Sequence, residues 1–139
     1  MTQLSSYLFF DGNCADAMRF YERTLGGKIE GMMTHAQAPD GAKSPPGNAN
    51  RILHARLVLD GQVLMASDLM VGQPYDGMKN FSLSLIYPTA ADAQRVFDAL
   101  AKGGEARMPM QKTFWVEIFG MVVDRFGTPW MVSGGKPGV

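Results

Sequence analysis

ADAMR at residues 15–19 returns as ADAQR at residues 91–95, with Ala, Asp, Ala and Arg at the same spacing. Each copy runs on to a pair of glycines, Gly26–Gly27 after the first and Gly103–Gly104 after the second. A segment that repeats together with its flanking breaker residues indicates a duplicated structural unit. The sequence therefore predicts two similar halves.

Both copies have the pattern of a helix that packs on a sheet. Asn13 stands three residues before Asp16, as a cap that places an acidic group near the positive end of the helix. Thr89 stands three residues before Asp92 in the same way. The glycine pairs suit the left-handed residue that ends a helix. Apolar side chains recur at helical spacing and form one face of each helix, namely Ala17, Tyr21 and Leu25 in the first and Ala93, Val96, Phe97 and Leu100 in the second.

Strand-forming sequence surrounds each helix, with one segment before it and three after it. Asp60–Gly61 is a hairpin turn, and Phe126–Gly127 takes the same place in the second half. Residues 37–50 are rich in Pro, Gly, Asn and Ser and are predicted to form a mobile surface loop, with a lid as the alternative. The predicted strands are 4–10, 28–36, 51–59 and 62–67 in the first half and 80–88, 105–111, 115–124 and 128–134 in the second.

Alternation along the strands separates two faces. In the strand that starts at residue 80, Phe81, Leu83 and Leu85 share one face, which we expect to meet the helix. The polar side chains of Asn80, Ser82 and Ser84 then face a cavity. By the same reasoning, the inward side chains of three other strands are predicted to be Ser6 and Leu8, Met65, and Met131.

Composition excludes several classes of partner. The chain has 139 residues, of which 46% are hydrophobic and 19% charged, so it can bury a core. Thirteen basic and thirteen acidic residues cancel without runs of either sign, which argues against nucleic acid or an anionic membrane as partner. The sequence shows no apolar membrane span and no basic start of a signal peptide, and it holds a single cysteine. A small-molecule partner and a cytoplasmic location are expected.

Three stretches resemble the vicinal oxygen chelate superfamily, in its PhnB-like branch, which is also called 3-demethylubiquinone methyltransferase-like. They are YLFFDGNCADAMRFY (7–21), LMASD (64–68), and FW (114–115) followed by FGMVVDRFGTPWMV (119–132). The resemblance implies an α+β fold of two βαβββ modules whose curved mixed sheets enclose a cavity. It places modules at about 1–70 and 78–139 within one domain, and it implies a homodimer. It does not imply methyl transfer, because no glycine-rich turn follows a strand to hold an adenosyl cofactor.

Metalloenzymes of this superfamily carry His or Glu ligands on the first and last strands of each module. The resemblance places those ligand positions at Ser6, Met65, Asn80 (or Ser82, if the register slips by two) and Met131. Hydroxyl, thioether and amide groups are poor ligands for such metals. No cofactor is therefore expected, with a divalent metal at relocated ligands as the alternative.

Other residues have both a functional and a structural interpretation. His54 is a candidate base or hydrogen-bond donor, with a structural histidine as the favoured alternative. His35 is expected to be solvated. Cys14, in the first turn of a helix, is either activated by the helix dipole or, as favoured, a buried packing residue. Trp130 is expected to pack under a helix, whereas Trp115 is expected to form a wall of the cavity.

Two hypotheses follow. The first is a binding protein without the usual metal, whose ligand contacts Ser6, His54, Met65, Asn80, Ser82, Trp115 and Met131. The second is a glyoxalase-like lyase, isomerase or dioxygenase with a relocated metal or with His54 as base. A structural domain that binds a protein partner is a third possibility.

Overall fold

The computed structural model describes residues 1–39 and 44–138. The chain divides into two compact units, Met1–Asp76 and Gly77–Val139, each built around its own helix and sheet. We call them the first and second modules. The expectation that they form one domain stays a prediction.

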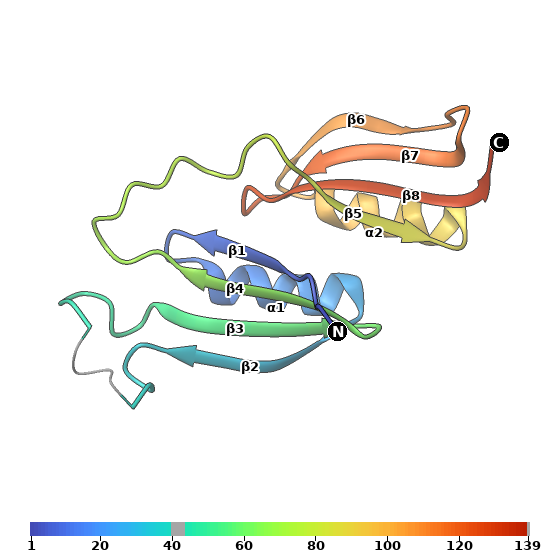
Figure 1. The fold of residues 1–139 in the computed structure, drawn as a ribbon. Coiled ribbons are helices and arrows are strands. Elements are labelled where there is room, and N and C mark those ends of the chain that lie inside the picture. The colour runs from blue at the N-terminus through green and yellow to red at the C-terminus, as the bar shows by residue number, and fades with distance from the viewer. Residues whose placement is uncertain (40–43, 139) are drawn as a thin grey trace. The chain divides into compact units, whose positions relative to one another are not determined.

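The first module contains a four-stranded sheet with one helix (Figure 1). The strand order is β1-β4-β3-β2, in which β1 runs parallel to β4 and the other neighbours are antiparallel. Figure 1 shows α1 lying across one face of this sheet. The elements are β1 (Ser6–Phe10), α1 (Cys14–Leu25), β2 (Lys28–Thr34), β3 (Ile52–Leu59) and β4 (Gln62–Asp68).

The second module repeats this arrangement, with strand order β5-β8-β7-β6 and β5 parallel to β8. Helix α2 covers one face of its sheet (Figure 1). The predicted α+β fold, two mixed sheets each in the order strand, helix, three strands, is confirmed. The elements are β5 (Leu83–Tyr87), α2 (Ala90–Ala101), β6 (Glu105–Gln111), β7 (Val116–Val123) and β8 (Pro129–Pro137).

The two helices begin differently. Thr89 caps α2 as predicted, because its hydroxyl accepts the backbone N–H of Asp92 at 3.1 Å. Asn13 occupies the predicted N-cap position of α1, but its side chain makes no capping hydrogen bond. Both predicted apolar faces pack inward, and that of α2 is buried in full: Ala93, Val96, Phe97 and Leu100.

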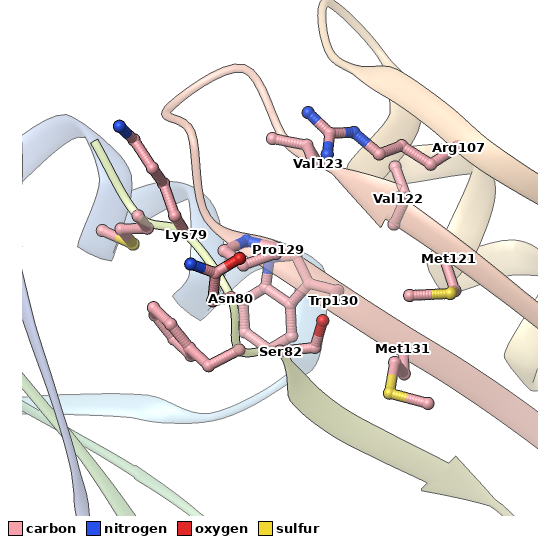
Figure 2. Close-up of a pocket in the computed structure, with 12 residues that line it drawn as sticks. Lys79, Asn80, Ser82, Arg107, Met121, Val122, Val123, Pro129, Trp130 and Met131 are labelled. Carbon is pink, nitrogen blue, oxygen red and sulfur yellow. The ribbon is translucent and has the colours of Figure 1, made fainter. Parts of the chain in front are cut away.

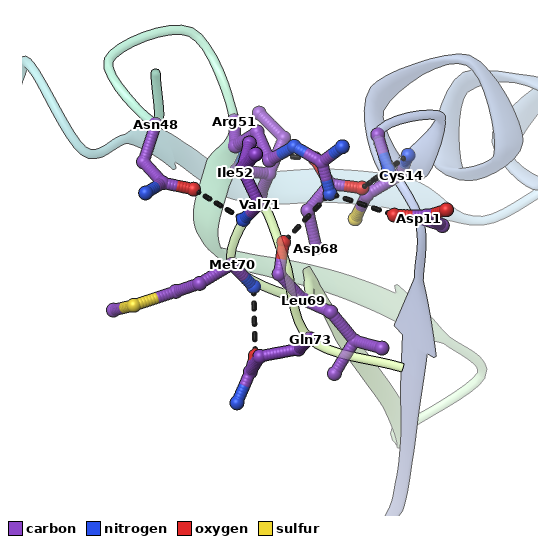
Figure 3. Close-up of polar contacts among 11 residues, drawn as sticks. Asp11, Cys14, Asn48, Arg51, Ile52, Asp68, Leu69, Met70, Val71 and Gln73 are labelled. Atoms are coloured by element: carbon purple, nitrogen blue, oxygen red, sulfur yellow. Dashed lines mark hydrogen bonds and ion pairs between the residues drawn. The ribbon is translucent and has the colours of Figure 1, made fainter. Parts of the chain in front are cut away.

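The buried carboxylate of Asp68 accepts backbone N–H groups at the start of α1, where the Asn13 side chain does not (Figure 3). Asp68, at the end of β4, is 6% exposed. Its Oδ1 accepts the backbone N–H groups of Gly12 at 2.8 Å and Cys14 at 3.0 Å. Its Oδ2 accepts the N–H of Ile52 at 2.8 Å. One side chain therefore joins the start of α1, the start of β3 and the end of β4.

Cys14 lies inside this junction and is fully buried. Burial, and then the negative charge of Asp68, raise the pKa of the Cys14 thiol to about 12. Both effects oppose the helix dipole, so the thiol stays protonated at neutral pH. The structural interpretation of Cys14 as a packing residue is confirmed.

The segment before β3 is held by side-chain contacts in the part that the structure describes. The Oδ1 of Asn48 accepts the N–H of Val71 at 2.8 Å, as Figure 3 shows. Arg51 donates to Asp11 at 2.9 Å and to the carbonyl of Leu69 at 2.8 Å. Within the predicted mobile loop 37–50, residues 40–43 lie outside the described residues.

The expectation that His35 is solvated is wrong. The residue is 3% exposed, and its Nδ1 lies 2.8 Å from the hydroxyl of Ser44. Its backbone N–H also donates to the carbonyl of Arg51. These contacts come from the chain that returns toward β3, so the sequence near His35 gives no sign of them.

Within residues 1–39 and 44–138, no helix is long and apolar enough to cross a membrane.

Candidate functional site

A cavity of about 800 Å³ lies in the second module (Figure 2). Apolar residues make up most of its lining, and those that are exposed or half-buried are Met78, Phe81, Met121, Val123, Pro129 and Met131. A volume of this size and a mostly apolar lining with a few polar groups are typical of small-molecule sites. The cavity is therefore the first candidate for a ligand site.

Strand pairing explains why Met121 and Met131 face the cavity together. The two residues are direct partners across β7 and β8. The opposite face of β8 packs on the helix, since a Cβ atom on Gly134 would come within 2.6 Å of the Cβ of Ala93 in α2. Trp130 has the parity of that helix face, and it is 2% exposed. The predicted packing of Trp130 is confirmed.

Trp130 is also fixed by a hydrogen bond. Its Nε1 donates to the Oδ2 of Asp124 at 2.8 Å. The Oδ1 of Asp124 accepts the N–H groups of Phe126 at 2.8 Å and Thr128 at 3.1 Å. This buried carboxylate organises the turn into β8 and so sets the position from which Met131 reaches the cavity wall. Like Asp68, it accepts two backbone N–H groups through one oxygen, but these partners lie in its own turn rather than on distant segments.

Asn80 and Ser82 also line the cavity, but not from a strand. The prediction of a strand from residue 80 is wrong at its start, because β5 begins at Leu83. The backbone of Asn80 is left-handed, with φ of 62°, a conformation that Asn adopts more readily than most residues and that a strand does not contain. The two polar side chains therefore lie on the segment that leads into β5. The structure places three of the predicted ligand residues, Asn80, Ser82 and Met131, around one cavity.

Two cationic side chains complete this wall, Lys79 on the segment before β5 and Arg107 on β6. Figure 2 shows Lys79 and Arg107 coming from different segments, with Pro129 and Trp130 between them in this view. Neither residue belongs to a sequence motif that predicts a site. Each is an ordinary surface cation by sequence pattern, and only the tertiary structure places both at one cavity.

The first module holds the other predicted site residues on a sheet. Met65 pairs with Tyr7 on β1 and with Arg56 on β3, so the three share the face opposite the helix. The hydroxyl of Tyr7 lies 3.5 Å from the Nδ1 of His54 on the same face. Arg56 forms an ion pair with Glu30 at 2.7 Å. Tyr7 and His54 thus form a polar pair beside Met65.

The predicted inward orientation of Ser6 and Leu8 is wrong. Ser6 has the parity of Leu8 and Phe10, which are 3% and 0% exposed and lie on the buried face of β1. Tyr7, 40% exposed, occupies the open face instead. The sequence could not distinguish the buried face of β1 from the exposed face, because YLFF is apolar at every position and shows no polar–apolar alternation.

Trp115 stands just before β7 and is 44% exposed. Its ring packs edge to face on Phe114 and Phe119, with centroids at 5.0 and 5.4 Å. Among the described residues around the 800 Å³ cavity, Trp115 does not appear. Its role as a ligand wall stays a prediction.

The positions implied for a metal do not fit one. Met65 and Met131 offer thioethers, Asn80 an amide and Ser82 a hydroxyl, whereas the hydroxyl of Ser6 lies on the buried-face side of its strand. Divalent metals prefer imidazole and carboxylate ligands. Over residues 1–39 and 44–138, no three His, Cys, Asp or Glu side chains gather closely enough to hold a metal ion.

Residues 2–133 match the model of a protein family described as 3-demethylubiquinone-9 3-methyltransferase. The chain belongs to this family. This is the PhnB-like branch that the three sequence stretches resemble, so the recognition is confirmed.

Known proteins similar to this chain extend over almost all of its length. Protein YjdN from Escherichia coli K12 is 36% identical over 94% of this chain and 93% of its own. The solved structure of PA1353 from Pseudomonas aeruginosa is 43% identical, with a TM-score of 0.90 over 97% of this chain and 98% of its own. The PhnB protein from Bacillus cereus is 24% identical, with a TM-score of 0.81 over 96% and 100%.

The fold is shared more widely. A glyoxylase/bleomycin resistance protein/dioxygenase domain from Frankia is 15% identical, with a TM-score of 0.67 over 98% of this chain and 93% of its own. At that identity the similarity shows the fold alone. It supports the predicted membership of the glyoxalase/bleomycin-resistance fold.

Proposed function

We propose that this protein binds a small, largely apolar molecule in the cavity of its second module. The observation that carries the proposal is the cavity of about 800 Å³ whose wall combines Met121 and Met131 with the polar Asn80 and Ser82. Thioether side chains are flexible and polarizable, so they adapt to apolar or aromatic ligands. The amide and hydroxyl supply the few polar contacts that orient a ligand.

We further propose that binding uses no metal at the positions where the superfamily's metalloenzymes have their ligands. The support is the donor set, which offers thioether, amide and hydroxyl groups in place of imidazole and carboxylate. Dialysis against a chelator is therefore expected to leave ligand affinity unchanged. A loss of affinity that added zinc, nickel or manganese restores would contradict this part of the proposal.

Methyl transfer, which the family description names, is not part of the proposal. A site for an adenosyl cofactor in an α/β protein uses a glycine-rich turn between a strand and a helix. Here the turn between β1 and α1 contains Gly12 alone, and its N–H is engaged by Asp68.

A second candidate function is a lyase or dioxygenase reaction that uses His54 as base. The observation that favours it is the 3.5 Å approach of His54 Nδ1 to the Tyr7 hydroxyl on the open face of the first sheet. A neutral imidazole beside a phenol can move a proton. Turnover of methylglyoxal with glutathione that is lost in His54→Ala and kept in Met131→Gln would favour this function over binding alone.

Fluorescence titration with N-phenyl-1-naphthylamine, a neutral aromatic probe, tests the binding proposal. Met131→Gln puts an amide in place of the thioether on the cavity wall. It is expected to lower the affinity for the probe by about tenfold, because apolar contact is lost. Met33→Gln, on the first module's β2, is the matched control and is expected to change affinity less than about twofold. No binding to the wild-type protein, or equal losses in both variants, would overturn the proposal.

The homodimer implied by the resemblance is a separate proposal. The chain has a mass of 15.2 kDa, so light scattering distinguishes a monomer of that mass from a dimer of twice that mass. A mass that stays at the monomer value over the whole concentration range would contradict it.

A further inference from the structure

We propose that the cavity of the second module takes an anionic ligand, one in which an apolar body carries a negatively charged group such as a carboxylate, sulfonate or phosphate. This inference rests on the proposed binding function and adds the ligand's charge. Lys79 and Arg107 border the cavity, and the described residues that line it include no Asp or Glu.

The local charge is not a consequence of a basic protein. The whole chain has thirteen basic and thirteen acidic residues and no net charge. Two cations without a carboxylate around one cavity therefore depart from the average of the chain. Positive potential at a cavity mouth raises the local concentration of anions and favours their binding.

Both cations are available to a ligand. Arg107 has one weak ion pair, from its Nε to Glu105 Oε2 at 4.0 Å, between side chains that are 63% and 71% exposed. A pair of this kind contributes little, so an anion can compete with Glu105 for the guanidinium. Lys79 is exposed and has no ion pair within the described part of the chain.

The polar groups beside the cations suit the same ligand. The Asn80 amide can donate through its NH₂ group, and the Ser82 hydroxyl can donate as well. Both line the cavity together with Lys79 and Arg107, whereas Met121 and Met131 form an apolar part of the wall. A ligand with its charged group near the cations would place its apolar body against the two thioethers.

A pair of probes separates the ligand's charge from its shape. 8-Anilinonaphthalene-1-sulfonate has the same ring system as N-phenyl-1-naphthylamine and adds one sulfonate. Lys79→Gln and Arg107→Gln are each expected to lower the affinity for the anionic probe by about two- to fivefold at low salt, which is the usual effect of losing a solvent-exposed charge pair. Each is expected to change the affinity for the neutral probe by less than about 1.5-fold. At about 0.5 M salt the two variants should no longer weaken binding of the anionic probe, because salt screens exposed charge pairs.

Lys28→Gln, on β2 of the first module, is the matched loss of one positive charge and should leave both affinities unchanged. Equal weakening of both probes by the cavity variants, or an equal effect of Lys28→Gln on the anionic probe, would overturn the anion inference while leaving the binding proposal in place. Failure of both probes to bind the wild-type protein would overturn the two together.

Discussion

Removing the Asp68 carboxylate should destabilise the first module strongly. In Asp68→Ala the N–H groups of Cys14 and Ile52 lose their buried acceptor, and that of Gly12 loses a partly buried one. A buried donor without a partner costs about 1–3 kcal/mol, and water can reach the partly buried one at lower cost. The expected loss is therefore about 4 kcal/mol, a large share of the 5–15 kcal/mol by which ordinary domains are stable.

Urea denaturation followed by far-UV circular dichroism measures this loss. Asp68→Asn, which keeps one acceptor and the side-chain volume, is expected to cost about 2 kcal/mol and provides a folded variant if the alanine variant does not fold. Asp11→Ala is the control, because Asp11 is 48% exposed in its ion pair with Arg51 and should cost less than about 1 kcal/mol. An Asp68→Ala protein no less stable than Asp11→Ala would refute the role given to this carboxylate.

Four further outcomes test other parts of the structure. Native Cys14 should react with iodoacetamide at pH 8 about a thousandfold more slowly than in urea, because its pKa is raised from an ordinary 9.0 to about 12; an equal rate would contradict this. The unfolded thiol loses its proton first as the pH rises above 9, so stability should fall by up to about 1.4 kcal/mol per pH unit toward pH 12, and Cys14→Ala should lack that slope. Trp130→Phe should lower the free energy of unfolding in urea by about 1–2 kcal/mol, because it loses the hydrogen bond to Asp124. Trp115→Phe should lower it by less than about 0.5 kcal/mol, and the reverse order would be inconsistent with the packing described. Asn80→Ala should be about 1 kcal/mol less stable than Asn80→Gly, since only glycine adopts the left-handed backbone without strain; equal stabilities would show that the conformation is not strained.

Residues with strong local patterns were predictable from sequence. The buried face of α2 follows from apolar side chains at helical spacing, and the opposite orientations of Trp130 and Met131 follow from strand alternation. In both cases the information lies within one element. The same holds for the order of strands and helices, which the internal repeat and the turn residues mark.

The sequence-based predictions that were wrong concern residues whose environment depends on contacts outside their own element. In YLFF every side chain is apolar, so the sequence did not show that Tyr7 rather than Ser6 shares the face of Met65. The Nδ1 of the buried His35 contacts the hydroxyl of Ser44, which lies nine residues further along the chain. Lys79 and Arg107 line one cavity because the fold brings two segments that are distant in sequence to the same side of the second module. Local periodicity contains no information on contacts of this kind.

Methyl resonances of methionine test most directly whether the second module's cavity is the binding site. The chain has eleven methionines, of which Met78, Met121 and Met131 line the cavity, whereas Met18, Met33 and Met65 belong to the first module. In a titration with N-phenyl-1-naphthylamine, the resonances of Met78, Met121 and Met131 should shift, and those of the three first-module residues should not. Shifts concentrated at Met33 and Met65, or none at Met131 under saturating probe, would contradict a binding site in this cavity.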